Sequence, residues 1–493
     1  MVMWRNLRKF AGFNAFGMKA RQVVIFLMGV FALLGAGWLA FPAEGVDVGG
    51  MNLRFASYRK MVQEASEAKV DVDSVLSAVG GRFAMRDADT LAYYKDFFYD
   101  NPDRIWLPDD DYTFFDPVFR DFERAALQGR TVRVVHYGDS QIEMDRISAD
   151  LRQALQERFG GSGTGMFPAL SNVPSASITK SASGGFVQYT MYGDSTTVRA
   201  GHNRYGVMAQ VVALTGGGTV SLRATKAKTA RERTKTFSSV SLLYGRASGG
   251  FSAKVVSDTL KPEPVVRESG GATWMTWTFP REVQKATLRL TGNAEIYGIC
   301  ADGPAGVTVD NIPLRGCSGT IFSRINPDLM QGSFGMDDTR LIILQFGGNF
   351  MPVATSDKAV SGYLEKMAAQ IQYFRTAAPQ ARILFIGPSD MGKSVNGRIM
   401  TWPRLPQMVD SLKATALRNG AAYWDLYRMM GGENSMVQWV KHVPAYAGPD
   451  YIHFTPAGAQ VVGETLSRSL LTYYDFYDLR KTLPASRVKA YMQ

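Results

Sequence analysis

From Asp338 onward, short apolar runs alternate with longer amphipathic stretches. The run RLIILQF (340–346) is typical of a buried strand, and AVSGYLEKMAAQIQYFRTA (359–377) has the spacing of an amphipathic helix. The same pair recurs as ARILFIG with LPQMVDSLKATALRNG, and again as AAYWDLY with PAGAQVVGETLSRSLLTYY. Strands and helices that alternate in this way form a parallel sheet with helices on both faces. The pattern therefore predicts a doubly wound α/β domain.

A strand and helix of the same kind lie much earlier, at VRVVHY (132–137) and in the residues that follow it to Phe159. The stretch 171–305 instead contains short β-type runs, such as VMAQVVAL and TVSLRA, separated by Gly, Ser and Thr turns. Strands at this spacing without intervening helices favour a β-sandwich. We therefore expect an all-β sandwich at 171–305, inserted into an α/β domain made of 126–170 and 306–480.

The amino terminus has the pattern of a membrane anchor. Residues 1–21 hold five Lys and Arg and no acid, and VVIFLMGVFALLGAGWLAF (23–41) has no charged side chain. At about 1.5 Å per residue, a helix of this run nearly covers a hydrocarbon core of ~30 Å. We expect a cytoplasmic basic segment at 1–21, a transmembrane signal-anchor at 22–42 and the remaining chain outside the cytoplasm. A cleaved signal is the alternative, although Phe41 or Trp38 would occupy the position that requires a small residue.

Two segments belong to none of these domains. Residues 43–125 mix short helical patterns with aromatic-rich loops and contain no catalytic motif, and 481–493 form a C-terminal tail.

Composition narrows the possible chemistry. The chain has two cysteines and four histidines, which excludes a disulfide scaffold and a four-cysteine zinc site and makes a metal centre unexpected. The net charge of +11 falls to +6 without the basic segment, which is a mild excess for 493 residues. Nucleic acid is therefore not an expected partner.

The strand at 132–137 leads directly into Gly138-Asp139-Ser140, and a helix follows. A serine at a sharp strand-to-helix turn lies at the carboxyl edge of the sheet, where ligands bind in open α/β folds. Its own N–H can face a developing oxyanion there. Ser140 is therefore the candidate nucleophile. The second copy, Gly193-Asp194-Ser195, has no strand–helix frame, and we interpret it as a turn.

A serine nucleophile needs a base, and the base needs an orienting group. Asp450-Tyr451-Ile452-His453 stands just before the last predicted helix. On a loop, the carboxylate can hydrogen-bond one imidazole nitrogen and leave the other facing the serine. Alone, such a pair is more often part of a surface loop or a helix cap. Together with Ser140 it predicts a Ser140–His453–Asp450 triad.

Two further loops can supply oxyanion donors. Asn349 follows the strand at 340–346, so its side-chain amide lies at the carboxyl end of a strand. The small residues of NIPLRGCSG (311–319) would let a backbone N–H approach a substrate closely.

In these four blocks the chain resembles the SGNH hydrolases of the GDSL superfamily. The serine, glycine, asparagine and histidine of that family fall, in order, on Ser140 in HYGDSQ, Gly316 in PLRGCSG, Asn349 in FGGN and His453 in DYIHFTPAG, with Asp450 completing the triad. The resemblance implies a flavodoxin-like, three-layer hydrolase domain with an oxyanion hole made by Ser140, Gly316 and Asn349.

One block has a second candidate, and one position departs from the family's pattern. Gly206 in RYGVMAQ is the alternative for the glycine, and Phe350 follows Asn349 where many relatives have an acidic residue.

A narrower resemblance is to bacterial SGNH proteins that act on O-acetylated peptidoglycan or other cell-wall glycans, with a carbohydrate-binding-like β-domain between the serine and glycine blocks. It rests on HYGDSQIEMDRI followed by GGSGTGMFP, and on MMGGENSMVQW followed by DYIHFT. It implies a serine esterase that removes O-acyl groups, most simply O-acetyl groups, from a cell-envelope polysaccharide. No metal or organic cofactor is required by this chemistry.

The predicted enzyme is a single-pass protein of the bacterial inner membrane with its catalytic domain in the periplasm. Its substrate would be an acylated cell-wall polysaccharide or exopolysaccharide, and we expect Gln141 and Trp439 to contact it. An O-acetyltransferase working with a multi-pass membrane acyltransferase is a second hypothesis, because water and a sugar hydroxyl can attack the same acyl-enzyme. A non-catalytic glycan-binding protein is a third, although it would not be expected to retain every block.

Three features of the β-rich region allow two interpretations each. Trp274 and Trp277, like Trp439, could stack on sugars or lie in a core, and Cys300 and Cys317 could pair in an oxidising compartment. A basic cluster could be a solvated hairpin, or could contact an acidic glycan or lipid head group. It comprises Arg223, Lys226, Lys228, Arg231, Arg233 and Lys235.

Overall fold

A computed structural model of the chain describes residues 28–30, 46–48, 51–53, 87–170, 173–193, 197–227 and 230–492. The chain divides into two compact units, Met1–Val70 and Asp71–Gln493. In the first unit, β1 (Val46–Val48) pairs with β2 (Met51–Leu53) in an antiparallel hairpin. The predicted membrane span at 22–42 lies outside the described residues except for the helical residues 28–30. None of the helices that the structure describes combines the length and apolarity needed to cross a membrane.

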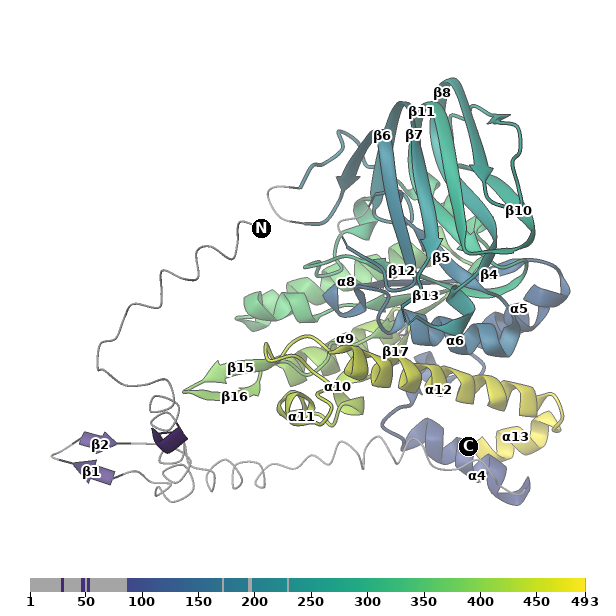
Figure 1. Cartoon of the computed structure of the whole chain (residues 1–493). Coiled ribbons are helices and arrows are strands. Elements are labelled where there is room, and N and C mark those ends of the chain that lie inside the picture. Colours follow the sequence, from purple (N-terminus) through teal and green to yellow (C-terminus); the bar gives the residue numbers. More distant parts are fainter. Residues whose placement is uncertain are drawn as a thin grey trace, which may run out of the picture. The chain divides into compact units, whose positions relative to one another are not determined.

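The second unit contains a six-stranded sheet in the order β12-β4-β13-β14-β17-β3 (Figure 1). Five strands are parallel, and β3 joins β17 antiparallel at one edge. The parallel strands follow the 2-1-3-4-5 order of flavodoxin-like sheets. The prediction of an α/β fold with a parallel sheet is confirmed. The strands are β3 (Ile105–Trp106), β4 (Thr131–Gly138), β12 (Gly306–Pro313), β13 (Thr339–Gln345), β14 (Arg382–Ile386) and β17 (Ala422–Trp424).

Both faces of this sheet are buried, because successive residues of each strand point to opposite faces. Along β13, Leu341 and Ile343 join one hydrophobic cluster, while Ile342 and Leu344 join the other. The first cluster contains side chains from α5 (Asp116–Leu127), α6 (Ser148–Phe159) and α12 (Pro456–Arg480). The second contains side chains from α7 (Pro327–Met336), α8 (Asp357–Ala377) and α9 (Leu405–Arg418).

Part of the region 43–125, for which the sequence offered no fold, belongs to the α/β layers. It supplies α4 (Asp87–Tyr99), the edge strand β3 and α5. The ring of Phe98 stacks on that of Tyr473 in α12, with centroids 4.5 Å apart, and the Tyr473 hydroxyl donates to the Ile105 carbonyl at 2.5 Å. These contacts tie the segment to the last long helix of the domain.

The C-terminal residues predicted as a tail form α13 (Ala485–Met492). Val488 and Met492 are buried in the same hydrophobic cluster as α4, and the Tyr99 hydroxyl donates to the Met492 carbonyl at 3.3 Å. The described end of the chain is therefore part of the packed unit.

The β-rich insertion forms one antiparallel sheet, with β10-β8-β11-β7-β6 in order, β5 on β11 and β9 on β8 (Figure 1). The expected sandwich of two sheets is therefore corrected to a single hydrogen-bonded sheet. Gly249, Gly250 and Gly292 lie inside the long strands β8 and β11 at or near register shifts, so these glycines do not end the strands. The strands are β5 (Gly163–Phe167), β6 (Ile178–Thr190), β7 (Gln210–Ala224), β8 (Phe237–Val256), β9 (Val265–Val266), β10 (Thr273–Val283) and β11 (Lys285–Asp302).

Smaller elements complete the unit. The hairpin of β15 (Gly392–Val395) and β16 (Arg398–Thr401) follows β14, and the short helices α10 (Leu426–Met429) and α11 (Ser435–Lys441) precede α12. Cys300 and Cys317 are both buried free thiols, so the possible disulfide is not formed.

A buried ionic cluster joins the two sheets. Arg133 on β4 donates to Asp310 on β12 at 2.9 Å and also to Asp302 at the end of β11. Asp310 in turn accepts the backbone N–H of Met166 on β5 at 2.7 Å. One guanidinium therefore compensates two carboxylates that desolvation would otherwise make costly.

Replacing Arg133 by Met should lower the free energy of unfolding by about 3–5 kcal/mol, because two buried carboxylates lose their cation. Urea unfolding measures the change. The control is Arg281→Gln, which breaks an exposed ion pair with Asp258 and should cost less than about 1 kcal/mol. Equal effects of the two substitutions would contradict the role assigned to the cluster.

Candidate active site

Ser140 lies where β4 ends, at the first residue of a 3-10 turn (Ser140–Ile142). The turn is tight, because a Cβ on Gly138 would lie 2.9 Å from the Ile142 side chain and would force that side chain to shift. The Asp139 side chain accepts the Gln141 N–H at 2.9 Å and so caps the turn. The hydroxyl of Ser140 consequently projects at the carboxyl edge of the parallel sheet, as its sequence context predicts.

The structure brings Ser140, His453 and Asp450 together. The Oγ of Ser140 and Nε2 of His453 are 2.8 Å apart, and His453 Nδ1 is 2.7 Å from Asp450 Oδ2. The other carboxylate oxygen of Asp450 accepts the backbone N–H groups of Ile452 and His453, at 3.0 and 3.1 Å. Such an arrangement lets the imidazole take the serine proton while the carboxylate fixes the imidazole tautomer.

Hydrogen bonding keeps Asp450 ionised. Its partial burial alone would raise the pKa, but the hydrogen bonds from the His453 ring and from two backbone N–H groups outweigh it and lower the pKa below its usual value. An ionised Asp450 is the form that can stabilise an imidazolium at His453.

Asn349 lies on the neighbouring loop, in a 3-10 turn (Gly348–Val353) that follows β13. Its Nδ2 donates to Asp139 Oδ2 at 2.8 Å and makes a longer contact of 3.3 Å with the Cys317 carbonyl. The first bond fixes the amide plane. The second hydrogen has only the long contact, so a stronger acceptor such as an oxyanion can compete for it.

Gly316 lies at the same sheet edge but is not part of the pocket wall. Its φ of +72° belongs to the left-handed region that favours glycine. The preceding Arg315 forms a bidentate pair with the buried Glu143, and the following Cys317 carbonyl is the one that contacts Asn349. These bonds hold the Gly316 loop between the serine and asparagine loops.

A pocket of about 180 Å³ opens at the triad. Polar residues line one part of it: Asp139, Ser140, Gln141, Gln345, Asn349, Ser389 and His453. The apolar part of the wall comprises Phe346, Pro352, Pro388, Met391, Trp402 and Ile452. The apolar part of the wall suits a small apolar acyl group, and the polar part suits the reacting ester carbonyl.

Gln141 lines the pocket, but its amide is used to hold the loop that carries His453. Its Nε2 donates to the Ile452 carbonyl at 2.7 Å, and its Oε1 accepts the Phe454 N–H at 3.3 Å. The Gln141 amide therefore positions the backbone on both sides of His453, and the predicted contact with substrate is not its main role.

Arg146, which sequence reasoning did not single out, makes a similar connection. Its Nη2 donates to the Ser140 carbonyl at 2.8 Å, Nη1 to the Phe454 carbonyl at 2.9 Å and Nε to the Glu143 carbonyl at 2.9 Å. One guanidinium thus joins the backbone of the serine loop to that of the histidine loop. An arginine in EMDRI offers no sequence signal for this role, because its three acceptors are backbone carbonyls.

The predicted role of Trp439 is wrong. The side chain is fully buried, its indole N–H donates to the Met430 carbonyl at 3.0 Å, and its ring packs against Tyr446 and Phe454. Its position on α11 places it in the core beneath the His453 loop. Trp402 is the tryptophan that lines the pocket.

The remaining candidates lie away from the triad or outside the described residues. Asp194 and Ser195 of the second GDS are not among the described residues. Gly206, the alternative glycine, lies over the Tyr297 ring, where a Cβ would approach to 3.1 Å. Trp277 is buried in the core of the antiparallel sheet, and Trp274 packs partly buried against the core of the α/β layers.

The comparisons with known proteins agree with this geometry. Residues 294–461, which include Gly316, Asn349, Asp450 and His453, match the model of the GDSL-like Lipase/Acylhydrolase family. Ser140 lies outside the matched range because the antiparallel sheet separates it from the other blocks in sequence. No curated protein matches the chain.

Among solved structures, a peptidoglycan O-acetylesterase has the same fold, with a TM-score of 0.60 and 21% identity over 74% of this chain and 97% of that chain. A family two carbohydrate esterase from Cellvibrio japonicus is 10% identical over 61% of this chain and 99% of that one, with a TM-score of 0.24. The second likeness is too weak to support an argument.

Residues 294–461 thus match the GDSL-like Lipase/Acylhydrolase family, and the chain is a GDSL-like acylhydrolase with an antiparallel β-sheet insertion between its serine block and its other blocks.

Substituting Arg146 by Ala should lower kcat about 10–100-fold, because the serine and histidine loops lose a shared cation and the Oγ–Nε2 distance is no longer fixed. The KM for a small ester should change little, since Arg146 does not line the pocket. Steady-state kinetics on a chromogenic ester measures both constants.

Arg146→Lys is the matched variant and should retain intermediate activity, because one ammonium reaches only some of the three carbonyls. Thermal unfolding checks that both variants fold. An unchanged kcat in a folded Arg146→Ala enzyme would show that the loops do not depend on this residue.

Proposed function

We propose that this protein is a serine esterase that removes O-acyl groups, principally O-acetyl groups, from a cell-envelope polysaccharide such as peptidoglycan. The observation that carries the proposal is the Ser140–His453–Asp450 hydrogen-bond chain at the mouth of a small, mainly apolar pocket. The fold shared with a peptidoglycan O-acetylesterase supports the choice of substrate.

In this mechanism, Ser140 Oγ attacks the ester carbonyl while His453 Nε2 accepts the hydroxyl proton. Asp450 holds the imidazole and stabilises the positive charge that forms on it. The N–H group of Ser140 and the side chain of Asn349 donate to the tetrahedral oxyanion, and the family's pattern assigns a further N–H donor to Gly316. His453 then protonates the departing sugar oxygen, and water hydrolyses the acyl-enzyme with His453 acting as base.

The pocket accounts for a preference for short acyl groups. Its volume of about 180 Å³ accommodates an acetyl group with room for part of a sugar, while its apolar side offers no partner for a charged acyl chain. Asp450 and His453 are partly exposed, with side-chain exposures of 48% and 39%, so a bulky polysaccharide can reach the reaction centre from outside.

We also propose that residues 22–42 anchor the enzyme in the bacterial inner membrane, with the catalytic unit in the periplasm. The support is the uninterrupted apolar run at 23–41 after a segment with five basic and no acidic residues. An enzyme held there would meet cell-envelope glycans and not cytoplasmic esters.

Ser140→Ala should reduce acetate release from purified O-acetylated peptidoglycan by at least about 10³-fold, because the nucleophile is lost. Ser195→Ala, in the second GDS motif of the same chain, is the matched control and should leave the rate unchanged. Activity of Ser140→Ala close to that of the parent would refute the assignment.

The same assay should include a glycan acceptor whose acetyl groups have been removed. Acetate in solution is the expected product. Transfer of acetyl groups to the acceptor in preference to water would replace the esterase proposal with an acetyltransferase that uses the same serine.

A reporter active only outside the cytoplasm, fused after Gln493, should be active, and the protein should remain with membranes at its full mass. Release of a shortened form would show that the segment is a cleaved signal. An inactive reporter would place the triad in the cytoplasm and exclude envelope polysaccharide as the substrate.

A further inference from the structure

One face of the antiparallel sheet carries a group of basic side chains, which we call the basic face: Arg223 on β7, Lys254 on β8, and Lys285 and Arg289 on β11. Residues directly opposite in an antiparallel pair point to the same face, and so do residues four apart on one strand. Lys285 pairs with Arg223, and Arg289 pairs with Lys254. The intervening Ala286, Leu288 and Leu290 point into the core on the other face.

These four cations form two like-charge pairs across neighbouring strands. Like charges directly opposite each other destabilise a sheet. Within the part of the chain that the structure describes, none of the four has a carboxylate in salt-bridge contact. Other cations of the insertion have such partners, since Arg204 and Arg246 bind Glu295 and Arg281 faces Asp258.

The basic face also differs from the basic cluster noted in the sequence. Arg231 pairs with Asp150, Lys235 pairs with Glu232, and Arg233 donates to the Gly161 carbonyl. Those side chains are therefore used within the fold. Arg223 is the member of that cluster that belongs to the unpaired group.

A groove of about 490 Å³ lies along one half of the basic face, with Arg223 and Lys285 in its wall. Ser181, Ser221 and Thr287 stand in register across β6, β7 and β11, and the hydroxyls of Ser221 and Thr287 are 3.5 Å apart. Asp258, which faces Arg281, is the one carboxylate in the wall, and the wall contains no aromatic ring. Hydroxyls and cations without aromatic or large exposed apolar side chains suit a hydrated, negatively charged sugar chain better than a membrane surface, which apolar side chains usually enter.

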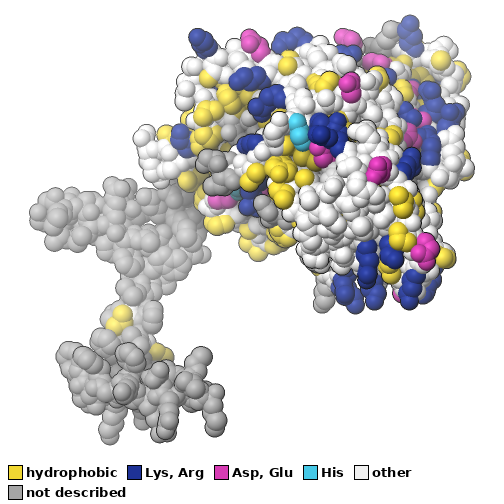
Figure 2. All heavy atoms as spheres, turned by 90° about the horizontal axis from the view of Figure 1, so that it is seen from above, with side chains coloured by type: hydrophobic (Ala, Val, Ile, Leu, Met, Phe, Trp, Pro, Cys, Tyr) yellow, Lys and Arg dark blue, Asp and Glu magenta, His cyan; other side chains and the backbone are white. Residues whose placement is uncertain are grey.

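Figure 2 views the molecule from above and shows Lys and Arg side chains over several parts of this surface, including a row along its lower rim, and fewer Asp and Glu side chains. Such a surface attracts a polyanion and orients it before close contact.

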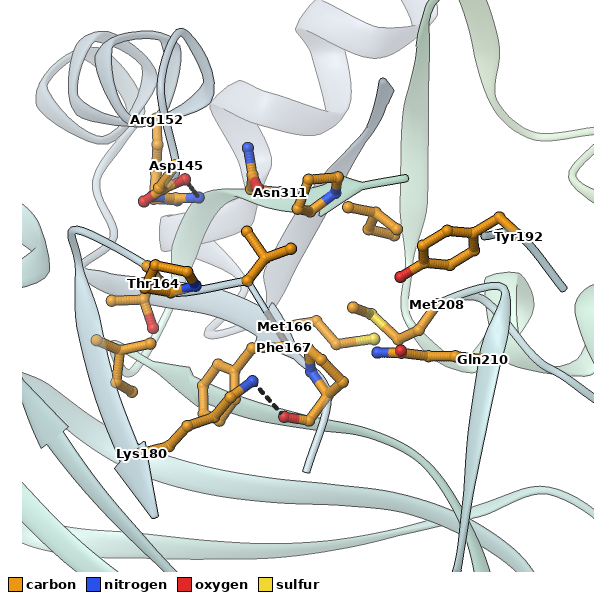
Figure 3. A pocket seen from close by; sticks show the side chains of 17 residues that line it. Asp145, Arg152, Thr164, Met166, Phe167, Lys180, Tyr192, Met208, Gln210 and Asn311 are labelled. Atoms are coloured by element: carbon orange, nitrogen blue, oxygen red, sulfur yellow. Dashed lines mark hydrogen bonds and ion pairs between the residues drawn. The ribbon is translucent and has the colours of Figure 1, made fainter. Parts of the chain in front are cut away.

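Lys180 points away from the basic face, because it pairs with the core residue Leu222, and its side chain lines a second hollow (Figure 3). Its ammonium donates to the Pro168 carbonyl at 2.6 Å and has no acidic partner among the described residues, and burial lowers its pKa to about 7. The hollow is also lined by Tyr192 and Pro313. Pro313 pairs with Gly138, two residues before Ser140, so the hollow ends beside the strand that carries the nucleophile.

We propose that the basic face binds an anionic glycan chain, with Arg223, Lys254, Lys285 and Arg289 contacting its carboxylates and the Ser and Thr hydroxyls contacting its sugars. The proposal rests on the proposed function, because the bound chain would be the polymer whose ester groups reach Ser140. It assigns the insertion the task of holding polymeric substrate, separately from the chemistry at the triad.

The test compares the full chain with a variant in which all four cations are replaced by Gln. Binding is measured by sedimentation with O-acetylated peptidoglycan sacculi, using the Ser140→Ala background so that hydrolysis does not alter the probe. The half-saturating sacculus concentration should rise about ten-fold or more in the variant. Its salt dependence should largely disappear, since salt screens exposed charges over about 10 Å at 0.1 M.

With Ser140 restored, kcat/KM on a small chromogenic ester should stay within about two-fold of the parent, while KM on sacculi rises. The double variant Arg223→Gln/Lys285→Gln removes one of the two like-charge pairs. Its charge-matched control is Lys366→Gln/Arg418→Gln, which removes the same net charge from α8 and α9. Because the substitutions remove like-charge pairs, the Tm of the variants should be unchanged or higher, which separates lost binding from misfolding.

Two further probes identify the ligand. Sacculi whose carboxylates are neutralised by amide coupling should bind the parent as weakly as untreated sacculi bind the variant. Vesicles of phosphatidylethanolamine and phosphatidylglycerol should show no difference between parent and variant. Loss of vesicle binding with unchanged sacculus binding would overturn the proposal in favour of a membrane contact.

Equal sacculus binding by parent and four-fold variant would also overturn it. Failure of the proposed function would appear differently, as an absence of acetate release from sacculi by the parent enzyme, whatever the binding result.

Discussion

The register of β4 between β12 and β13 determines where the reactive loops begin. Gly138 at the end of β4 pairs with Pro313 on one side and with Gln345 on the other. The loops that carry Ser140, Gly316 and Asn349 therefore start at one level of the sheet, where the chain order reverses and ligands bind in this class of fold. A shift of one residue in either pairing would turn the strand's faces over and move these loops apart.

Buried polar groups fix that register. His136 on β4 is fully buried, and its ring lies 2.9 Å from Ser148 Oγ on α6 and 3.1 Å from Gln345 Oε1 on β13. Burial lowers its pKa to about 3, so the imidazole is neutral and acts as a structural link, not as a base. Asn311 on β12 donates to the same Ser148 hydroxyl at 2.7 Å. Three strands and a helix thus share one network directly behind the catalytic edge.

The chemistry of the site could be predicted from sequence because its residues lie in short local patterns. Ser140 follows a strand and precedes a helix, and Asp450 and His453 are three residues apart before a helix that begins at a proline. The alternation of strands and helices after Asp338 likewise predicts the parallel sheet, because both periodicities are visible in the sequence.

The features that could not be predicted depend on distant partners. Tryptophan often stacks on sugar rings, which made Trp439 a candidate, and only the packing of α11 under the His453 loop shows that its side chain is buried. The aromatic side chains of α4 and α5 find their partners in α12, more than three hundred residues later, so residues 87–127 look irregular in isolation. The single antiparallel sheet was missed because glycines inside long bulged strands resemble turns.

Asp139 lies beside Asn349 at the same edge of the parallel sheet, close to where the oxyanion would form. A carboxylate near an oxyanion is unfavourable on charge alone. However, Asp139 accepts one N–H of Asn349 at 2.8 Å and fixes the amide, so a substrate oxygen can compete for the other N–H, whose contact with the Cys317 carbonyl is long.

Burial raises the pKa of Asp139 to about 6, although hydrogen bonds from the Gln141 N–H and Asn349, together with the nearby His453, oppose that rise. The attraction to His453 grows when the imidazole becomes positively charged during attack. Asp139 therefore repels the oxyanion but stabilises the imidazolium and orients the donor amide. On the proposed mechanism, two of its three effects favour the transition state.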